Sequence, residues 1–129
     1  LFNKLQKYIE LNNLENKVIL HGFKNNPYKI MSNSDLLVLP SFSEGTSRAA
    51  LESLFLGVPC ILKNVDNNNE LLKPEFDNGS VFNKDIDLPE IMLLECLKSR
   101  MREKRKNLLP INYRQTSVKN KYLKLIDEI

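Results

Sequence analysis

The spacing of hydrophobic positions changes several times along the first forty residues, and each spacing predicts a different element. Residues 1–14 carry apolar side chains at helical intervals, which predicts an amphipathic helix. The β-branched run at 18–20 predicts a strand. An Asn-Pro pair opens residues 26–31 and predicts a capped start for a short helix. Residues 35–39 are apolar without alternation, which is typical of a parallel strand covered on both faces.

The next segment has the pattern of a parallel crossover unit. Pro40 ends the strand, and the polar loop at 41–47 leads into a helix expected over residues 48–56. Gly57 stops this helix, and a further apolar strand is expected at 59–62. Strand, loop, helix and strand in this order predict two parallel strands joined by a right-handed crossover.

The rest of the chain continues the alternation of short strands and helices. Residues 64–69 predict a polar loop, 70–72 a helical turn, 78–79 a turn and 81–82 a last strand. Two helical stripes follow on either side of Pro110: Ile91, Leu94, Leu97 and Met101, then Val118, Tyr122, Leu125 and Ile129. The fold class is therefore α/β, a Rossmann-like parallel sheet flanked by helices. Three or four strands are few for such a sheet, so we expect residues 1–129 to be a single partial domain whose amino-terminal strands are missing.

Composition excludes several classes of protein. The chain has 129 residues, 42% hydrophobic and 27% charged, which allows a core without disulfide or metal support. Its apolar runs are far shorter than a membrane-spanning helix requires. Cys60 and Cys96 lie among apolar neighbours and are expected to be reduced, which fits a cytoplasmic protein. The one histidine, His21, is expected to be packed or solvated rather than catalytic, and no metal site is predicted.

Charge is concentrated toward the carboxyl end. Between Lys98 and Lys124 there are ten basic residues and one acidic residue, a local charge of +9, so the remainder of this +3 chain carries −6. Residues 98–129 thus form a basic helical tail, which either meets an anionic membrane surface or is a solvated helix face. Nucleic acid is not expected as a partner, because few aromatic side chains interleave with the basic ones.

The most favourable ligand site lies in the loop after residues 35–39. Ligands of open parallel sheets bind beyond the carboxyl ends of the strands. Gly45 permits close approach of the backbone, and the following helix start presents unpaired amides from Thr46 to Ala49. This arrangement predicts a site for a phosphate group, although the chain has neither a Walker lysine nor a dinucleotide-binding glycine motif.

Two acids flank this predicted anion site. Glu44 would repel a phosphate unless it faces other groups, and vicinal hydroxyls of a sugar suit a carboxylate. Glu52 could accept hydrogen bonds from a diol such as ribose, or could pair with Arg48 one helical turn earlier. Ser41 lacks the sequence partners of a nucleophilic triad.

These motifs, in this order, resemble the donor-binding signature of family 4 retaining glycosyltransferases. The matching runs are residues 18–23 (VILHGF), 34–41 (SDLLVLPS), 43–46 (SEGT), 51–53 (LES), 57–61 (GVPCI), 70–72 (ELL) and 78–79 (NG). The resemblance covers roughly residues 1–100 and implies the carboxyl-terminal lobe of the GT-B architecture. That lobe binds a nucleotide sugar, and the activity implied is sugar transfer with retention of configuration.

The resemblance also implies roles for individual residues. Glu44 would be the catalytic residue, which contacts hydroxyls of the donor sugar and polarises it rather than acting as a simple general base, and Glu52 would hold the ribose. The remaining donor-binding residues are those of the loop and helix start (Ser41, Gly45, Thr46, Ser47 and Arg48) and those beside the base (Gly22, Phe23 and Lys24). No metal or other cofactor is implied, and the donor is expected to be a UDP-sugar rather than a GDP-sugar. The basic pair that such enzymes bring to the diphosphate lies upstream of this segment, so neither Arg48 nor Lys63 is assigned to it.

The implied partners are a nucleotide sugar and a glycan or lipid-linked acceptor, the latter held by an amino-terminal lobe that these residues lack. The implied setting is cell-surface polysaccharide biosynthesis, in the cytoplasm or at the inner face of the membrane. We expect the fragment alone to bind nucleotide weakly and to lack transferase activity. The alternative is a non-catalytic nucleotide-sugar-binding or membrane-docking module.

Overall fold

A three-stranded parallel sheet forms the centre of the molecule. The computed structural model describes residues 1–43, 45–65, 68–101 and 106–117. The strands are β1 (Leu37–Leu39), β2 (Cys60–Lys63) and β3 (Gly79–Phe82), in the order β1-β2-β3. Leu37 lies opposite Cys60, which lies opposite Gly79. The parallel α/β architecture expected from the sequence is confirmed.

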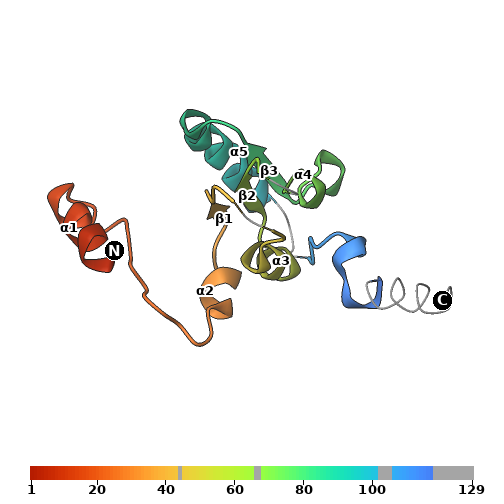
Figure 1. Ribbon diagram of the computed structural model, residues 1–129, viewed down its shortest axis with the longest axis horizontal. Coiled ribbons are helices and arrows are strands. Elements are labelled where there is room, and N and C mark those ends of the chain that lie inside the picture. The colour runs from red at the N-terminus through yellow and green to blue at the C-terminus, as the bar shows by residue number, and fades with distance from the viewer. Residues whose placement is uncertain (44, 66–67, 102–105, 118–129) are drawn as a thin grey trace.

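The described part of the chain also contains α-helices, of which α3 and α5 contact the sheet. They are α1 (Phe2–Leu11), α2 (Tyr28–Ser32), α3 (Arg48–Phe55), α4 (Asn68–Leu71) and α5 (Leu88–Met101), with short 3₁₀ turns at Pro74–Phe76, Asp85–Asp87 and Ile111–Tyr113. Figure 1 shows α3 and α5 on opposite sides of the sheet. None of these helices is long and apolar enough to cross a bilayer.

The central strand is buried on both faces, as its unbroken apolar run predicts. Cys60, Ile61 and Leu62 of β2 are fully buried. The core cluster joins α3, β2, α4 and a later segment of the chain: Ala50, Leu54, Cys60, Leu62, Leu71, Leu72, Leu108 and Leu109. The amide of Leu108 donates to the Leu54 carbonyl at 2.8 Å, which holds this later segment against α3.

Local signals set both ends of α3, so its predicted bounds are nearly correct. The Ser47 hydroxyl accepts a hydrogen bond from the Ala50 amide and caps the first turn. At the other end, Gly57 has φ +78°, its amide donates to the Leu54 carbonyl, and the Val58 amide donates to the Ser53 carbonyl. This Schellman arrangement stops the helix and directs the chain into β2.

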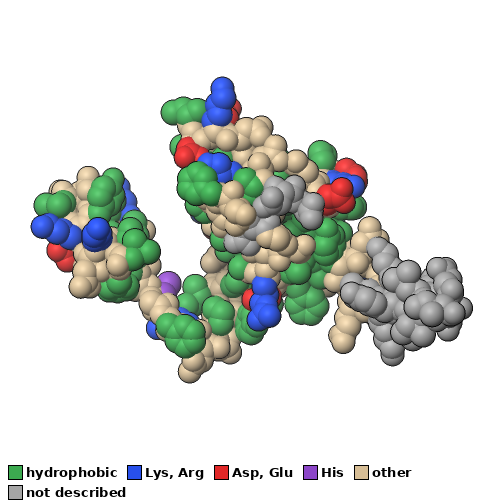
Figure 2. Space-filling view, viewed as in Figure 1, with side chains coloured by type: hydrophobic (Ala, Val, Ile, Leu, Met, Phe, Trp, Pro, Cys, Tyr) green, Lys and Arg blue, Asp and Glu red, His purple; other side chains and the backbone are tan. Residues whose placement is uncertain are grey.

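The strand predicted at residues 18–20 is wrong for this structure. These residues are not part of the sheet, and Ile19 is 72% exposed. A strand requires a hydrogen-bonded neighbour, and the described strands pair only as β1 with β2 and β2 with β3. The adjoining helix α1 stands apart from the sheet, with hydrophobic side chains on its surface (Figures 1 and 2).

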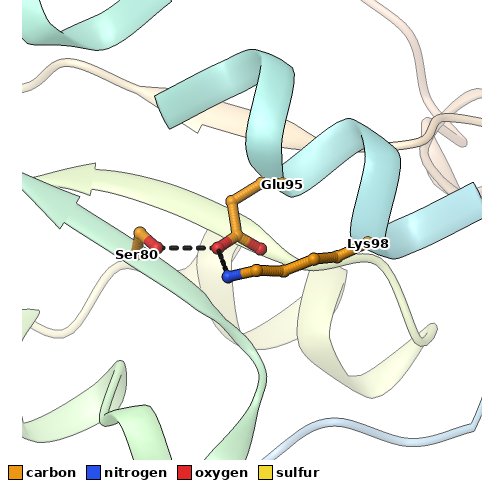
Figure 3. A network of polar contacts seen from close by, with 3 residues as sticks. All are labelled: Ser80, Glu95 and Lys98. Carbon is orange, nitrogen blue, oxygen red and sulfur yellow. Dashed lines mark hydrogen bonds and ion pairs between the residues drawn. The ribbon is translucent and has the colours of Figure 1, made fainter. Parts of the chain in front are cut away.

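The helix α5 is where the sequence predicts a helix, but it does not bury the predicted stripe. Three members of the stripe, Leu94, Leu97 and Met101, are exposed. The buried residue of α5 is instead Glu95, which is not part of the stripe. Glu95 instead faces the sheet, where Ser80 of β3 donates a hydrogen bond to its Oε1 at 2.8 Å and Lys98 donates to the same oxygen at 2.9 Å (Figure 3). Its buried Oε2 has no hydrogen-bond partner among the described residues. The helix predicted from the stripe at 118–129 lies outside the described residues.

Candidate functional site

The loop after β1 and the start of α3 together present a row of backbone amides. Pro40 follows β1 directly, and Ser47 caps α3 through the Ala50 amide at 3.5 Å. Within the described part of the chain, the amides from Gly45 to Ala49 have no hydrogen-bond acceptor in the protein. An α-helix leaves its first amides without internal acceptors, so these donors are available to an anion.

The space in front of these amides is open. Gly45, Thr46 and Arg48 are exposed, and a Cβ atom built at Gly45 would have no neighbour within 4 Å. Gly45 therefore has no packing reason to lack a side chain. The open space would allow a ligand to approach the backbone of Gly45 closely.

Lys63 and Phe42 order the neighbouring part of this edge. The Lys63 ammonium at the end of β2 lies 4.3 Å from the centre of the Phe42 ring and 3.0 Å from Asp85 Oδ1. Lys63 thus links the loop after β1 to the turn that precedes α5. The sequence did not predict this contact, because Phe42 and Lys63 are brought together only when β1 and β2 pair.

Glu52 lies one turn further along α3 and faces Tyr28 of α2. The Tyr28 hydroxyl donates to Glu52 Oε1 at 3.4 Å, a long hydrogen bond. The Arg48–Glu52 ion pair considered from the sequence is not among the ion pairs of the described residues. Tyr28 and Glu52 line an apolar cavity of about 590 Å³ together with Phe55, Leu109 and Arg114.

Tyr28 is a site residue that sequence analysis missed. Its backbone position was predictable, because the Asn26 side chain accepts a hydrogen bond from the Tyr28 amide at the start of α2. The approach of its hydroxyl to Glu52 was not, since 24 positions separate the two residues. Asn26 thereby fixes the backbone from which Tyr28 lines this cavity.

The segment predicted to lie beside the base is placed elsewhere. Gly22 and Lys24 line a separate hollow of about 280 Å³ with Leu37 and Val58. Leu37 begins β1 and Val58 precedes β2, so this hollow lies at the amino ends of the strands. Phe23 is 89% exposed. The structure therefore does not join Gly22, Phe23 and Lys24 to the loop at 41–47, and their base-binding role stays a prediction.

The cysteines are free, as expected. Cys60 is buried and Cys96 is half-buried. Burial raises the pKa of the Cys60 thiol to about 12, against a smaller lowering by its contact with Ser53. This thiol is thus a protonated core group rather than a nucleophile. Among the described residues, no group of three His, Cys, Asp or Glu side chains is placed to hold a metal ion.

Two predicted features fall outside the described residues. Glu44 is one of them, so its catalytic role stays a prediction. Residues 102–105 and 118–129 of the basic tail are the other. Ser41 and the amides from Gly45 onward belong to the one loop that follows β1, and Glu52 lies on α3, the helix that follows this loop.

Known proteins similar to this chain are glycosyltransferases. A UDP-Gal:alpha-D-GlcNAc-diphosphoundecaprenol alpha-1,3-galactosyltransferase of Escherichia coli is 33% identical over 122 residues, which is 88% of this chain and 32% of the relative. An N-acetylgalactosamine-N,N'-diacetylbacillosaminyl-diphospho-undecaprenol 4-alpha-N-acetylgalactosaminyltransferase of Campylobacter jejuni is 50% identical over 42 residues, which is 33% of this chain and 12% of the relative.

A solved structure shares the fold. The crystal structure of Anabaena Alr3699/HepE in complex with UDP matches with a TM-score of 0.67 and 16% identity, over 99% of this chain and 37% of that one. The chain thus spans about a third of the length of the E. coli relative and of the Anabaena protein. The family model for glycosyl transferases group 1 matches residues 1–109. This chain therefore belongs to the group 1 glycosyltransferase family, and its parallel α/β fold is that of a GT-B glycosyltransferase.

Proposed function

We propose that this chain is the donor-binding lobe of a retaining glycosyltransferase that transfers a sugar from a nucleotide sugar to a glycan or lipid-linked acceptor. The observation that carries the proposal is the open row of amides from Gly45 to Ala49 at the carboxyl end of β1. The names of the E. coli and Campylobacter relatives support a lipid-linked acceptor, and the UDP in the Anabaena structure supports a UDP-sugar donor. The setting we propose is cell-surface polysaccharide assembly on the cytoplasmic side of the membrane.

In the proposed chemistry, backbone amides at the start of α3 stabilise the departing diphosphate. As the bond between sugar and diphosphate breaks, negative charge grows on the diphosphate, and amides already oriented toward it stabilise that charge. Each charge-assisted hydrogen bond contributes about 1.5–3 kcal/mol, and the helix dipole adds about 0.3–1 kcal/mol. Two such bonds account for a substantial part of the binding energy that a diphosphate requires.

The acids complete the proposed site. Glu52 accepts hydrogen bonds from the ribose diol at the mouth of the cavity that it shares with Tyr28. Glu44 contacts hydroxyls of the donor sugar and polarises it. In the full-length protein, Glu44→Gln should reduce turnover strongly while leaving the protein folded.

The decisive experiment compares UDP with 2′-deoxy-UDP and 3′-deoxy-UDP by isothermal titration calorimetry. Wild-type protein should bind UDP more tightly than either deoxy analogue, and Glu52→Gln should reduce that difference. Glu90→Gln, which changes an exposed acid on α5, is the matched control and should leave the difference unchanged. Equal affinity of the wild type for UDP and both analogues would contradict the role of Glu52. No binding of UDP or GDP by the full-length protein would contradict the donor-lobe assignment.

A further inference from the structure

Lys63 is the last residue of β2, and its side chain is largely enclosed although it lies at the edge of the sheet that carries the candidate site. This side chain is 16% exposed, and its ammonium lies 3.0 Å from Asp85 Oδ1. The same ammonium lies 4.3 Å from the centre of the Phe42 ring and 5.8 Å from the centre of the Phe82 ring. A cation over the face of an aromatic ring is attracted to it, and the attraction is stronger where water is excluded. Lys63 therefore joins the loop after β1 to the end of β3 and to the turn that follows it.

Hydrogen bonds fix the backbone that carries Lys63. The Asn68 side chain donates to the Lys63 carbonyl at 2.8 Å, and the Asn64 amide donates to the Phe82 carbonyl at 2.8 Å. The Asn64 side chain donates to Asn83 Oδ1 at 2.7 Å, which ties the end of β2 to the end of β3 a second time. β2 also lies between β1 and β3 in the sheet (Figure 1). Lys63 is thus a fixed point against which the neighbouring loop is held.

Phe42 belongs to the loop that presents the amides, three positions before Gly45. Its ring is 81% exposed, and Phe42 is not a member of the core cluster. Burial therefore contributes little to holding this ring, whereas the Lys63 ammonium lies over it. Three residues of chain reach at most about 11 Å, so the position of the Phe42 ring limits where the amides from Gly45 onward lie.

We propose that Lys63 is a positioning residue of the donor site, which acts through the Phe42 ring. The contact holds the loop of residues 41–47 so that the amides from Gly45 to Ala49 face the diphosphate before it binds. Amides that are already in place bind an anion without the entropy cost of ordering the loop. This inference rests on the proposed function, because it concerns the same amides.

The alternative is that Lys63 binds the diphosphate directly. Its ammonium is largely enclosed by two aromatic rings and already pairs with Asp85, which favours the indirect role. A contact that orders a loop adds to the affinity for a ligand no more than its own strength. Loss of a cation–π contact should therefore weaken binding about threefold to thirtyfold.

A double-mutant cycle on the full-length protein separates these roles, with UDP affinity measured by isothermal titration calorimetry. Phe42→Leu and Lys63→Met should each weaken UDP binding about threefold to thirtyfold. The combined variant should bind no more weakly than Lys63→Met alone, because both changes remove the same contact. Phe42→Tyr keeps the aromatic face and should bind as the wild type does.

Lys84→Met is the matched control, because it removes an exposed lysine from the turn after β3. It should leave UDP affinity unchanged. The variants are expected to fold, since Phe42 is exposed and the Asp85 side chain, which loses its partner in Lys63→Met, is 74% exposed. Thermal unfolding checks this for each variant.

NMR of the lysine ε-methylene groups measures the contact itself in protein without nucleotide. The ring current of Phe42 should move the Lys63 ε-proton signals upfield, and Phe42→Leu should reduce this shift while Phe42→Tyr retains it. A wild-type signal without the shift would overturn the inference, whether or not UDP binds.

The affinities decide the remaining outcomes. If Lys63→Met weakened UDP binding and Phe42→Leu did not, Lys63 would contact the diphosphate directly and the positioning role would be wrong. Unchanged UDP affinity in both single variants would also overturn it. A wild type that shows the upfield shift but binds no UDP would contradict the donor-lobe assignment, and the positioning role would fall with it.

Discussion

Replacement of Gly45 by alanine separates the ligand-binding role of the loop from its folding. A Cβ atom at this position has no neighbour within 4 Å, and Gly45 is not among the residues with positive φ. The added methyl group therefore costs the folded state nothing through contact or backbone strain. Because alanine restricts the unfolded chain, the free energy of unfolding should stay the same or rise by up to about 1 kcal/mol.

The same methyl group should weaken the binding of a diphosphate. It stands in the open space in front of the amides, where the proposed donor approaches the backbone. Displacing the diphosphate from one charge-assisted hydrogen bond costs about 1.5–3 kcal/mol, which is a loss of about ten- to one-hundred-fold in affinity. UDP affinity and thermal unfolding should be measured together for the wild type and Gly45→Ala.

Ser43→Ala is the matched control, because Ser43 is an exposed residue of the same loop. It should change neither UDP affinity nor the melting temperature appreciably. If Gly45→Ala bound UDP as tightly as the wild type, the diphosphate would not lie against these amides. If the variant unfolded at a clearly lower temperature, the open space at Gly45 would itself be in question.

Two further predictions concern the core. Gly79 has φ +138°, and a Cβ atom there would collide with the Cys60 carbonyl of the neighbouring strand. Gly79→Ala should therefore lower the free energy of unfolding, measured by urea titration, by about 3 kcal/mol or more. A near-wild-type urea midpoint would show that β2 and β3 are not in this register. Burial raises the pKa of Cys60 to about 12 from an ordinary value of 9.0, so the unfolded chain loses this proton first as pH rises, and the stability of the fold should decline between pH 9 and 12. The stability of Cys60→Ser, followed over the same pH range, should decline less than that of the wild type. In the folded protein, iodoacetamide should modify Cys96 before Cys60, and rapid labelling of Cys60 would contradict its burial.

Part of the fold was predictable because its signals are local. The Ser47 cap and the Gly57 stop act within a turn or two of the backbone, so the bounds of α3 follow from neighbouring residues. The apolar runs of β1 and β2 are equally local, and the helix between them implies a parallel crossover. The loop with Gly45 was predictable for the same reason, since it joins two elements that are each recognisable alone.

Other features depended on which elements meet. Residues 18–20 have the composition of a strand, but no described strand lies beside them to share hydrogen bonds. The helical stripe of α5 gave the wrong buried face, since Glu95 instead faces Ser80 of β3. The Tyr28 hydroxyl reaches Glu52 only because α2 is folded against α3.

The sequence by itself thus determined the helices and strands around α3, their parallel order and the exposed amides that follow β1. The tertiary structure decided which helix face is buried, which apolar run enters the sheet and which side chain meets Glu52. The physical reason is the separation along the chain over which each kind of interaction acts. Caps, turns and hydrophobic periodicity act between residues a few positions apart, whereas strand pairing and the burial of a charged group depend on partners that only the folded chain brings into contact.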